Sequence, residues 1–252
     1  MRGKFFSIIT PVFNGATFIE ETIKSIVDQN FKDFEYIIID GASTDGTQKI
    51  IHKHSSKIDK FISEKDEGMY DAINKGIKLS KGKYILWVNS DDILADNSCL
   101  ERLSKYLNKV EAEWVTGRVS FIFEKQKKIY NFIPYIYPNF FIKNGLAHDC
   151  FWGFIQQEST VFSRELYYRA GGFNKNLKMA GDFDLWKKFS NYTHLDTCNL
   201  KIGVQRKWTG QMQKDLKFYY KEIRKKKCKF KFFKYFRLFY SILFYPYIFF
   251  KK

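Results

Sequence analysis

Four short apolar runs, three of which end in a polar loop, constrain the fold of this chain more than any other feature of its sequence. Strand-favouring isoleucine, phenylalanine and tyrosine dominate these runs, which span residues 5–10, 34–39, 61–63 and 84–88. Between them, apolar residues recur at helical spacing, and Thr17 and Glu20 have the spacing of a capping box at the start of the first helix. Strands that alternate with helices build a mostly parallel sheet through right-handed crossovers. The sequence therefore predicts an α/β fold in which helices flank this sheet.

Three of the predicted strands end in polar loops, with the sequences TPVFN, DGASTD and NSDD. Because ligands of parallel sheets bind beyond the carboxyl ends of the strands, we expect these loops to form one site. The first loop lacks both the G-x-G-x-x-G of dinucleotide enzymes and the P-loop motif. A nucleotide bound here would therefore need another means of neutralising its phosphates.

Paired carboxylates follow the most apolar strand, YILWV, at Asp91 and Asp92. A divalent cation explains the pair, because Mg²⁺ and Mn²⁺ prefer oxygen ligands and share them with substrate phosphates. The alternative is a solvated turn that caps a helix starting near Asn97. Asp40, at the end of the second strand, is either a turn former or a hydrogen-bond acceptor for a nucleobase or ribose.

A second pair of carboxylates, Asp182 and Asp184, lies in the segment AGDFDLW. The apolar residues around them predict that a helix starts here and packs inward. Acidic residues in the first turn of a helix are favoured by its dipole, so helix capping alone would account for the pair. The functional alternative is that one of the two is a general base.

Taken together, these segments resemble glycosyltransferase family 2, the inverting nucleotide-sugar transferases of the GT-A fold. The resemblance covers about residues 5–186 and rests on the order and spacing of its segments: SIITPVFNGATFIEETIKSIVDQ, FEYIIIDGASTDGT, DEGMYDAINKGIKLSKGKYILWVNSDD, QQESTVF, GGFN and GDFDLW. Within the family the chain looks most like bacterial enzymes that build exopolysaccharide, capsule or O-antigen. The implied fold is a Rossmann-like, mostly parallel sheet flanked by helices.

The resemblance also implies roles for individual residues. Those expected to hold the nucleoside are Thr10, Pro11, Phe13 and Asp40. Those expected to flank the diphosphate or the base are Asp66, Asn74 and Lys75. Asp91 and Asp92 match the family's Asp-x-Asp-type metal motif, with Asp91 at the nucleotide-sugar and Asp92 as the direct ligand of Mn²⁺ or Mg²⁺. Asp182 matches the catalytic base of the family's Glu-Asp motif.

The chain departs from the family pattern at three places. Only one carboxylate remains after the second strand, because the family's Asp-Asp-Gly-Ser is Asp40-Gly41-Ala42-Ser43 here. Gly181 replaces the Glu of the Glu-Asp motif, which leaves Asp184 as an alternative base. Ile73 stands where an Arg often precedes Asn, so another cation must contact the phosphates. Candidates for that cation near the C-terminal end of the family domain lie in the segment Gln205-Arg206-Lys207.

The activity that the resemblance implies is transfer of a sugar from a nucleotide-diphosphate sugar, with UDP as the expected nucleotide, to a hydroxyl group. The expected acceptor is a glycan or a lipid-linked glycan in cell-surface polysaccharide synthesis. Trp152 and Trp186 could stack on sugar faces or lie in the core. A sugar nucleotidyltransferase is a competing hypothesis, but it would need a Gly-rich phosphate loop. A catalytically inactive partner protein with the same fold is another, and the retained aspartates argue against it.

The C-terminal fifth of the chain has a different composition. Residues 201–252 hold 16 Lys and Arg against two acids, a net charge of +14 out of +16 for the whole chain. On a helix over 229–243, aromatic residues share one face and Lys231, Lys234 and Arg237 the other. This pattern is typical of an interfacial helix on an anionic membrane. A helix packed on the catalytic domain is the alternative, and no single-strand-binding fold supports nucleic-acid binding.

We therefore expect two parts, a catalytic domain over 1–210 and a basic, aromatic tail over 211–252 that associates with a membrane. The N-terminal apolar run FFSIIT is too short for a signal peptide. No stretch reaches the roughly 20 apolar residues of a membrane-spanning helix. The predicted location is cytoplasmic, peripheral on the inner face of the bacterial plasma membrane.

Overall fold

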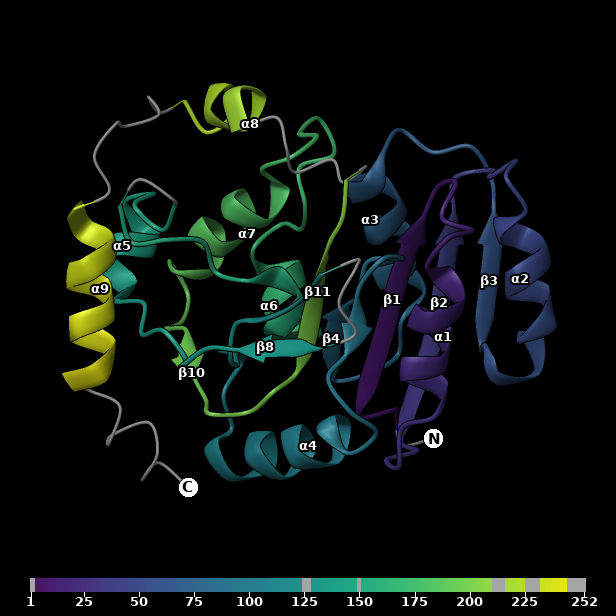
Figure 1. The fold of residues 1–252 in the computed structure, drawn as a ribbon, viewed down its shortest axis with the longest axis horizontal. Coiled ribbons are helices and arrows are strands. Elements are labelled where there is room, and N and C mark those ends of the chain that lie inside the picture. Colours follow the sequence, from purple (N-terminus) through teal and green to yellow (C-terminus); the bar gives the residue numbers. More distant parts are fainter. Residues whose placement is uncertain (1–2, 124–127, 149–150, 210–215, 225–231, 244–252) are drawn as a thin grey trace.

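A seven-stranded sheet forms the centre of the computed structural model, which describes residues 3–123, 128–148, 151–209, 216–224 and 232–243 (Figure 1). The strand order is β10-β6-β9-β4-β1-β2-β3. The strands are β1 (Phe6–Val12), β2 (Phe34–Asp40), β3 (Lys60–Ser63), β4 (Tyr84–Trp87), β6 (Trp114–Thr116), β9 (Thr160–Ser163) and β10 (Asp196–Thr197). Only β9 runs antiparallel to its neighbours, β4 and β6, among the pairs in the described ranges. The predicted mostly parallel sheet and its first four strands are confirmed.

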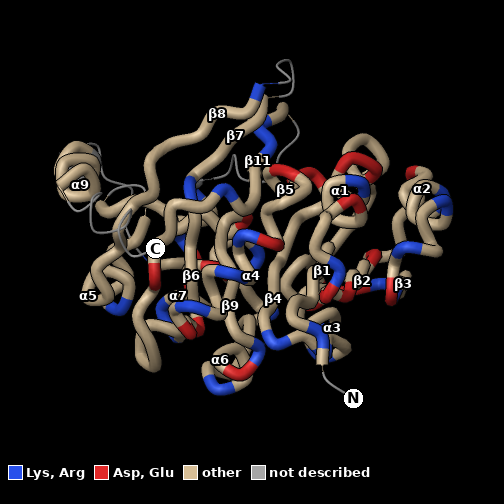
Figure 2. The backbone as a smooth tube through the Cα atoms, turned by 90° about the horizontal axis from the view of Figure 1, so that it is seen from below, with Lys and Arg blue, Asp and Glu red and all other residues tan. Residues whose placement is uncertain are grey.

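Helices cover both faces of this sheet (Figure 2). One layer consists of α1 (Ile19–Val27), α2 (Thr47–Lys53) and α4 (Cys99–Val110), and the other of α3 (Met69–Leu79), α5 (Asn139–Lys143), α6 (Arg164–Arg169) and α7 (Gly181–Phe189). Neighbouring strand residues point to opposite layers, so Ile8 packs with the first and Ile9 with the second. Two single-turn 3₁₀ helices, η1 (Ser55–Lys57) and η2 (Gln157–Ser159), complete the main body. Because the sheet is buried on both faces, its central strands β1, β2, β4 and β9 are mostly apolar.

The first helix begins later than the sequence predicts. Phe18 precedes the first turn of α1 and no side chain caps it, so the predicted capping box of Thr17 and Glu20 is wrong. The carbonyl of Gly15 instead accepts hydrogen bonds from Phe18 N (3.1 Å) and Ile19 N (3.0 Å). Gly15 N in turn donates to Thr47 Oγ1 of the next βα unit at 2.9 Å. The loop before α1 is thus fixed by local main-chain hydrogen bonds and by a tertiary contact to Thr47, not by a side-chain cap.

A smaller sheet, which the sequence did not predict, lies against the edge where the polar loops gather. Its order is β5-β11-β7-β8, and its strands are β5 (Ile93–Leu94), β11 (Gly203–Lys207), β7 (Ser120–Phe123) and β8 (Ile129–Asn131). Gly203 and Val204 of β11 pair with β5, which directly follows Asp91 and Asp92. This pairing carries the basic end of β11 to the carboxylates that follow β4.

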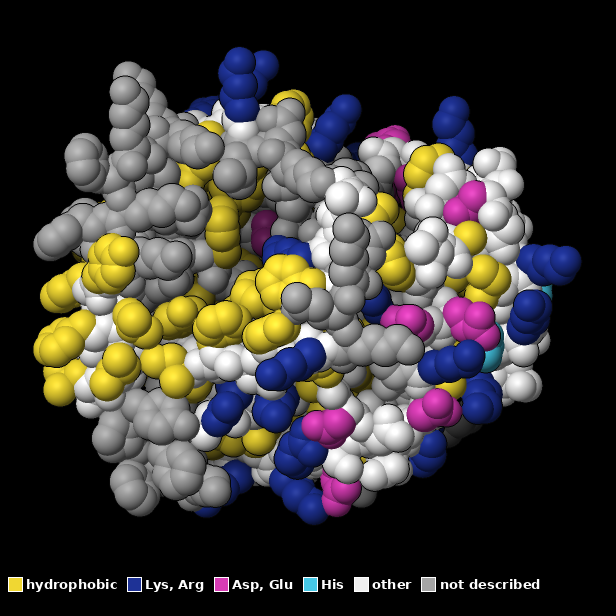
Figure 3. Space-filling view, viewed as in Figure 1, with side chains coloured by type: hydrophobic (Ala, Val, Ile, Leu, Met, Phe, Trp, Pro, Cys, Tyr) yellow, Lys and Arg dark blue, Asp and Glu magenta, His cyan; other side chains and the backbone are white. Residues whose placement is uncertain are grey.

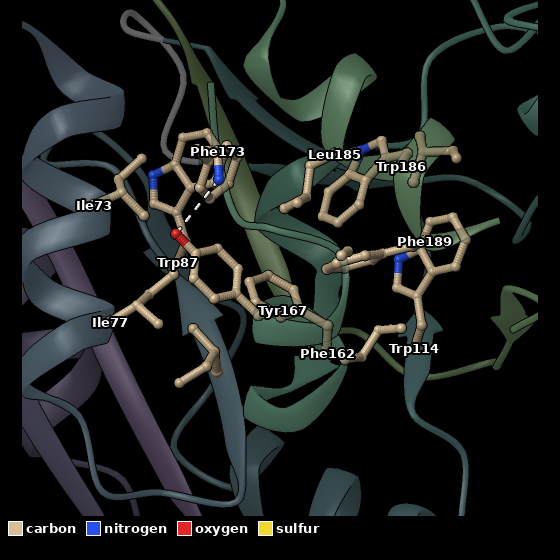
Figure 4. Close-up of a cluster of buried hydrophobic side chains, with 14 of the residues drawn as sticks. Ile73, Ile77, Trp87, Trp114, Phe162, Tyr167, Phe173, Leu185, Trp186 and Phe189 are labelled. Atoms are coloured by element: carbon tan, nitrogen blue, oxygen red, sulfur yellow. Dashed lines mark hydrogen bonds between the residues drawn. The ribbon is translucent and has the colours of Figure 1, made fainter. Parts of the chain in front are cut away.

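Trp152 and Trp186 are core residues, so the possibility that they stack on a sugar is wrong. Trp186 stacks on Trp114 with ring centroids 5.4 Å apart, beside Leu185 and Phe189 (Figure 4). Trp152 packs on Phe141 at 4.5 Å. The alternative that the sequence left open, burial among other aromatic side chains, is therefore the correct one.

The C-terminal tail contributes two described helices, α8 (Leu216–Glu222) and α9 (Phe232–Leu243). The predicted helix over 229–243 is thus confirmed for residues 232–243, whereas the predicted boundary at 210/211 lies outside the described residues. One face of α9 packs on the main body, where Tyr240 lies 5.5 Å from Trp152 and Ser241 Oγ accepts a hydrogen bond from Ile136 N. No helix in the described part of the chain is long and apolar enough to cross a membrane.

Candidate active site

The loops after β1, β2 and β3 meet around Gly41. A Cβ added to Gly41 would lie 2.8 Å from Asp66 Oδ2 and 3.3 Å from Phe13 Cδ2, so the three residues are in close contact. The Phe13 ring is 64% exposed, an unusual position for an apolar residue inside a loop cluster. Thr10 and Pro11 are buried beneath it, and the Thr10 hydroxyl accepts a hydrogen bond from Tyr36. Phe13, from the set predicted to hold the nucleoside, and Asp66, from the set predicted to flank the diphosphate or the base, are therefore accessible to a ligand.

Asp40 has no exposed surface, and its carboxylate is occupied by the loop that follows it. Oδ2 accepts hydrogen bonds from Ser43 N (3.0 Å) and Ser63 Oγ (2.6 Å), and Oδ1 accepts one from Ser43 Oγ. These contacts hold the GASTD loop in place beside Phe13. Direct contact between Asp40 and a nucleoside stays a prediction, and it would require the surrounding loop to move, because Asp40 has no exposed surface.

The other two residues predicted near the diphosphate or the base are engaged with protein neighbours. Asn74 donates to Phe173 O at 3.1 Å and accepts a hydrogen bond from the Tyr167 hydroxyl. This places it against the GGFN segment, behind the site. Lys75 forms ion pairs with Glu64 (2.8 Å) and Asp71 (3.2 Å), which raise its pKa.

Asp91 and Asp92 lie at the end of β4 with different surroundings. Asp92 is buried, and its Oδ1 and Oδ2 accept hydrogen bonds from Arg206 N (2.9 Å) and Asn89 Nδ2 (3.1 Å). Asp91 is partly exposed, and its Oδ2 accepts a hydrogen bond from Trp208 Nε1 at 2.7 Å. The smaller sheet therefore fastens both aspartates, with Asp91 in the outer position.

The segment Gln205-Arg206-Lys207, in which the extra cation was expected, places its three residues in different environments. Gln205 and Arg206 are buried, and the Arg206 guanidinium pairs with Glu21 and stacks 4.6 Å from the Phe18 ring. Lys207 is partly exposed, and burial lowers its pKa although Glu158, Asp92 and Asp91 oppose that shift. Lys207 is thus the cation that faces the carboxylates.

Asp182 lies in the first turn of α7, partly exposed, and burial raises its pKa to about 6. Its Oδ1 accepts a hydrogen bond from Phe183 N at 2.8 Å. Asp184, the alternative base, forms an ion pair with Lys188 one turn further along the same helix, at 2.7 Å. A carboxylate that ionises near neutral pH and is not held by a cation is suited to accept a proton, so the geometry supports Asp182 over Asp184.

The absence of the family's Glu at position 181 has a physical reason. A Cβ on Gly181 would lie 2.5 Å from Cζ of Tyr70, so the tyrosine ring fills the space that a side chain at 181 would need. Tyr70 is buried, and its ring stacks on Phe173 at 5.3 Å. The start of α7 therefore packs against the start of α3 through the contact between Gly181 and Tyr70.

Two further acids of the site were missed by the sequence analysis. Glu158 in η2 is buried, and its pKa is raised to about 7 by burial and by the charges of Asp91 and Asp182, against the effect of Lys207. Glu222 at the end of α8 accepts hydrogen bonds from three successive main-chain N–H groups, those of residues 178, 179 and 180. Glu222 thereby fixes the loop that leads into Asp182. Neither acid stands at the end of a predicted strand, so no local pattern marked them.

The residues at the end of β4 fit a divalent cation that is shared with a substrate. Burial, Glu158 and Asp91 raise the pKa of Asp92 well above its ordinary value, and a nearby cation would relieve this repulsion. Over the described ranges, no group of three or more His, Cys, Asp or Glu side chains is arranged to hold a metal ion. If these aspartates are the protein ligands of Mg²⁺ or Mn²⁺, most of the coordination positions of the cation are filled by other oxygens, such as those of a diphosphate.

Comparisons with known proteins identify the family of this chain. The model of the family "Glycosyl transferase family 2" matches residues 7–169. A glycosyltransferase of Rickettsia prowazekii, described as uncharacterized, is 30% identical over 196 residues, which are 73% of this chain and 58% of that protein. A PGL/p-HBAD biosynthesis glycosyltransferase of Mycobacterium bovis is 32% identical over 114 residues, 44% of each chain. The chain thus spans little more than half the length of the Rickettsia relative.

Solved structures agree in fold. The crystal structure of S. aureus TarS 1–349 in complex with UDP-GlcNAc has a TM-score of 0.67 at 18% identity and covers 87% of this chain and 64% of its own. The mannosyltransferase PcManGT from Pyrobaculum calidifontis, in complex with GDP-Man and Mn²⁺, has a TM-score of 0.61 at 19% identity, with 98% and 72% covered. With the family match over most of its length and the GT-A architecture of these structures, the chain belongs to glycosyltransferase family 2.

Proposed function

We propose that the protein transfers a sugar from a nucleoside-diphosphate sugar to a hydroxyl group of a glycan or lipid-linked glycan, with inversion, in cell-surface polysaccharide synthesis. The observation that carries this proposal is the convergence of Asp91, Asp92 and Asp182 at one edge of the sheet, beside the surface made by Phe13 and Asp66. The ligands named for TarS and PcManGT, UDP-GlcNAc and GDP-Man, support a nucleotide-sugar donor. UDP is the expected nucleotide.

In the proposed reaction, Phe13 and Asp66 hold the nucleoside, and Asp92, supported by Asp91, would hold a divalent cation. That cation, Mn²⁺ or Mg²⁺, would neutralise the charge of the departing diphosphate. Asp182 accepts the proton of the acceptor hydroxyl as its oxygen attacks the anomeric carbon from the face opposite the diphosphate. The bond between the anomeric carbon and the diphosphate oxygen breaks, and its electron pair leaves with the diphosphate. Attack from the opposite face inverts the anomeric centre.

The activity is tested with a panel of UDP-, GDP- and dTDP-sugars in the presence of Mn²⁺, read out as nucleoside diphosphate release. We expect release from one class of donor and none in excess chelator. A sugar nucleotidyltransferase would instead release pyrophosphate from a nucleoside triphosphate and a sugar 1-phosphate. An inactive partner protein would give neither product, and either result would contradict the proposal.

We also propose that the tail associates with an anionic membrane on the cytoplasmic side. Support comes from the outer face of α9, where Tyr235, Phe239, Ile242 and Leu243 are each more than half exposed. Figure 3 shows that hydrophobic side chains gather over this helix. Exposed apolar patches of this kind mark interaction surfaces, and the net charge of +14 over residues 201–252 favours an anionic one. A membrane surface also suits a lipid-linked acceptor.

Replacing Tyr235, Phe239 and Leu243 together by serine should therefore lower binding to phosphatidylglycerol vesicles by more than about tenfold, because each buried aromatic or leucine contributes about 1.5–3 kcal/mol. Co-sedimentation measures the loss, and nucleoside diphosphate release checks that the catalytic site is intact. Point variants are preferable to removal of the tail, since removal would also take away Glu222. Serine at both Tyr168 and Tyr192, exposed aromatics outside α9, is the control. Equal vesicle binding by all three proteins would contradict membrane association through α9.

A further inference from the structure

The segment Gln156–Ser159 is fastened to three different strands. Gln156 exchanges hydrogen bonds with the main chain of Ser120 in β7, both at 3.0 Å. Gln157 accepts a hydrogen bond from Asn89 at 3.1 Å and donates one to Trp87 O at the end of β4. The Ser159 hydroxyl lies 3.1 Å from Gly203 O of β11. Three of the four side chains in this segment are thus used to fix its position.

The main chain of the fourth residue, Glu158, is held equally tightly. A Cβ on Gly203 would lie 1.9 Å from Glu158 O, so β11 approaches this residue as closely as only a glycine permits. The Glu158 side chain is 3% exposed. Its position therefore leaves the carboxylate little freedom to move.

Within the described part of the chain, the buried Glu158 carboxylate has fewer donors than burial normally demands. No other described residue donates a hydrogen bond to it, and its own main-chain N–H acts to lower its pKa. The charge of Lys207 favours the ionised form of Glu158, whereas the charges of Asp91 and Asp182 oppose it. Burying an incompletely paired carboxylate costs free energy, and a segment built to hold one there points to a ligand that supplies the missing donors.

The position of Glu158 defines which part of a substrate would supply them. Glu158 follows Gln157, which accepts a hydrogen bond from Asn89, and Asn89 also donates to Asp92. The charges of both Asp91 and Asp182 act on the Glu158 carboxyl group. Within the described ranges, Glu158, Asp91 and Asp92 do not form a group arranged to hold a metal ion. If the proposed function is correct, the group that lies between the diphosphate end and the base is the sugar that is transferred.

We propose that Glu158 accepts hydrogen bonds from a hydroxyl group of the transferred sugar and so contributes to the choice of donor. A sugar hydroxyl is a good donor to a carboxylate, and such charge-assisted hydrogen bonds are stronger than neutral ones. Sites built to bind a hydroxyl reject an analogue that lacks it, because their buried polar group is then left unpaired. The inference rests on the proposed function for the identity of the ligand, and on the geometry of η2 for the residue.

The test compares Glu158→Gln with the wild-type full-length protein and with Glu165→Gln, a matched change at an exposed acid on α6. Calorimetry with Mn²⁺ measures the affinity of each for the preferred nucleotide-sugar and for its nucleoside diphosphate. Glu158→Gln should weaken binding of the nucleotide-sugar by about 10- to 100-fold and that of the nucleoside diphosphate by less than about twofold. Equal weakening of both ligands, or of neither, would overturn the inference.

Deoxy analogues of the same donor separate contact from a structural role. The wild-type protein should lose affinity for one analogue, and Glu158→Gln should cause no further loss with that analogue. A uniform loss across all analogues would mean that Glu158 acts only on the fold. Melting temperatures show whether Glu158→Gln is folded. If it folds poorly, Glu158→Asp, which keeps the charge, takes its place in the comparison. If the wild-type protein binds no nucleotide-sugar, the proposed function itself fails. If it binds and turns over the donor but Glu158→Gln does so equally well, only the role of Glu158 is wrong.

Discussion

Replacing Asp182 by asparagine is expected to lower kcat by about 10²- to 10⁴-fold, the usual contribution of a positioned general base. The change is nearly isosteric and keeps the Oδ1 that accepts the hydrogen bond from Phe183 N. Binding of the nucleotide-sugar should persist, since Asp182 acts on the acceptor. Because burial raises the pKa of Asp182 to about 6, the ionised form is disfavoured in the folded protein. The variant should therefore keep or increase its melting temperature at pH 7.5 while it loses activity.

The same carboxylate should produce the acid limb of the pH profile. Asp182 must be ionised to accept a proton, so kcat/KM should fall about tenfold per pH unit below its pKa of about 6. The groups that face it from other elements are Tyr70, Tyr219 and Glu158. Only Glu158, with a pKa raised to about 7, titrates in the same range. The profile is therefore measured in Glu158→Gln as well, where the limb near pH 6 should remain.

Asp184→Asn is the matched control for the base. Asp184 is ion-paired with Lys188 on the outer part of α7, and its loss should change kcat by less than about threefold. A large effect of Asp184→Asn with a mild effect of Asp182→Asn would mean that the wrong carboxylate has been assigned. An unchanged acid limb in a residually active Asp182→Asn variant would contradict the assignment as well.

The sheet edge and its loops were predictable because each signal was local. The run from Tyr84 to Trp87 is apolar, so both its strand and the change to polar residues at Asn89 follow from the sequence alone. Parallel order then places successive loops at one edge. Asp91 and Asp92 could be listed as site residues on this basis, before any contact was known, whereas Phe13 was named from the family resemblance.

Residues that reach the site through tertiary pairing could not be found in this way. Glu158 lies near Asp91 because β9 runs antiparallel to β4, with Val161 opposite Leu86. Its sequence context, QQES, has no strand or helix periodicity that would reveal the antiparallel direction of the strand that follows it. Lys207 reaches the site only through the pairing of β11 with the two-residue strand β5. The exclusion of a side chain at Gly181 likewise depends on Tyr70, which is remote in sequence.

Some site residues were placed near a ligand by resemblance and have a mainly supporting position here. Asp40 is enclosed by Ser43 and Ser63, and Asn74 bridges Tyr167 and Phe173. A motif match identifies the residue and its element but not the direction of its side chain. That direction is set by packing partners, which differ between chains with as little as 18% identity.

Removal of the divalent cation is expected to abolish turnover, and Asp92→Asn should have nearly the same effect. Stabilising the leaving diphosphate through a metal contributes several kcal/mol, so we expect a loss of at least about 10³-fold. The variant also changes the protein, because an amide in place of the carboxylate cannot accept from both Arg206 N and Asn89 Nδ2. Its melting temperature should therefore fall by a few degrees, and activity must be compared at a temperature where it remains folded.

Asp91→Asn provides the comparison that separates binding of the cation from support of the fold. Its amide oxygen can still accept the hydrogen bond from Trp208, and the side chain is partly exposed, so the melting temperature should not change. If Asp92 is the direct ligand, Asp92→Asn should shift the Mn²⁺ concentration needed for half-maximal rate by more than Asp91→Asn does. Because partners of metal ligands typically contribute 10- to 100-fold in affinity, a shift of about that size is expected for Asp91. The reverse order would assign direct coordination to Asp91, whereas full activity of both variants in excess chelator would exclude a metal from the reaction.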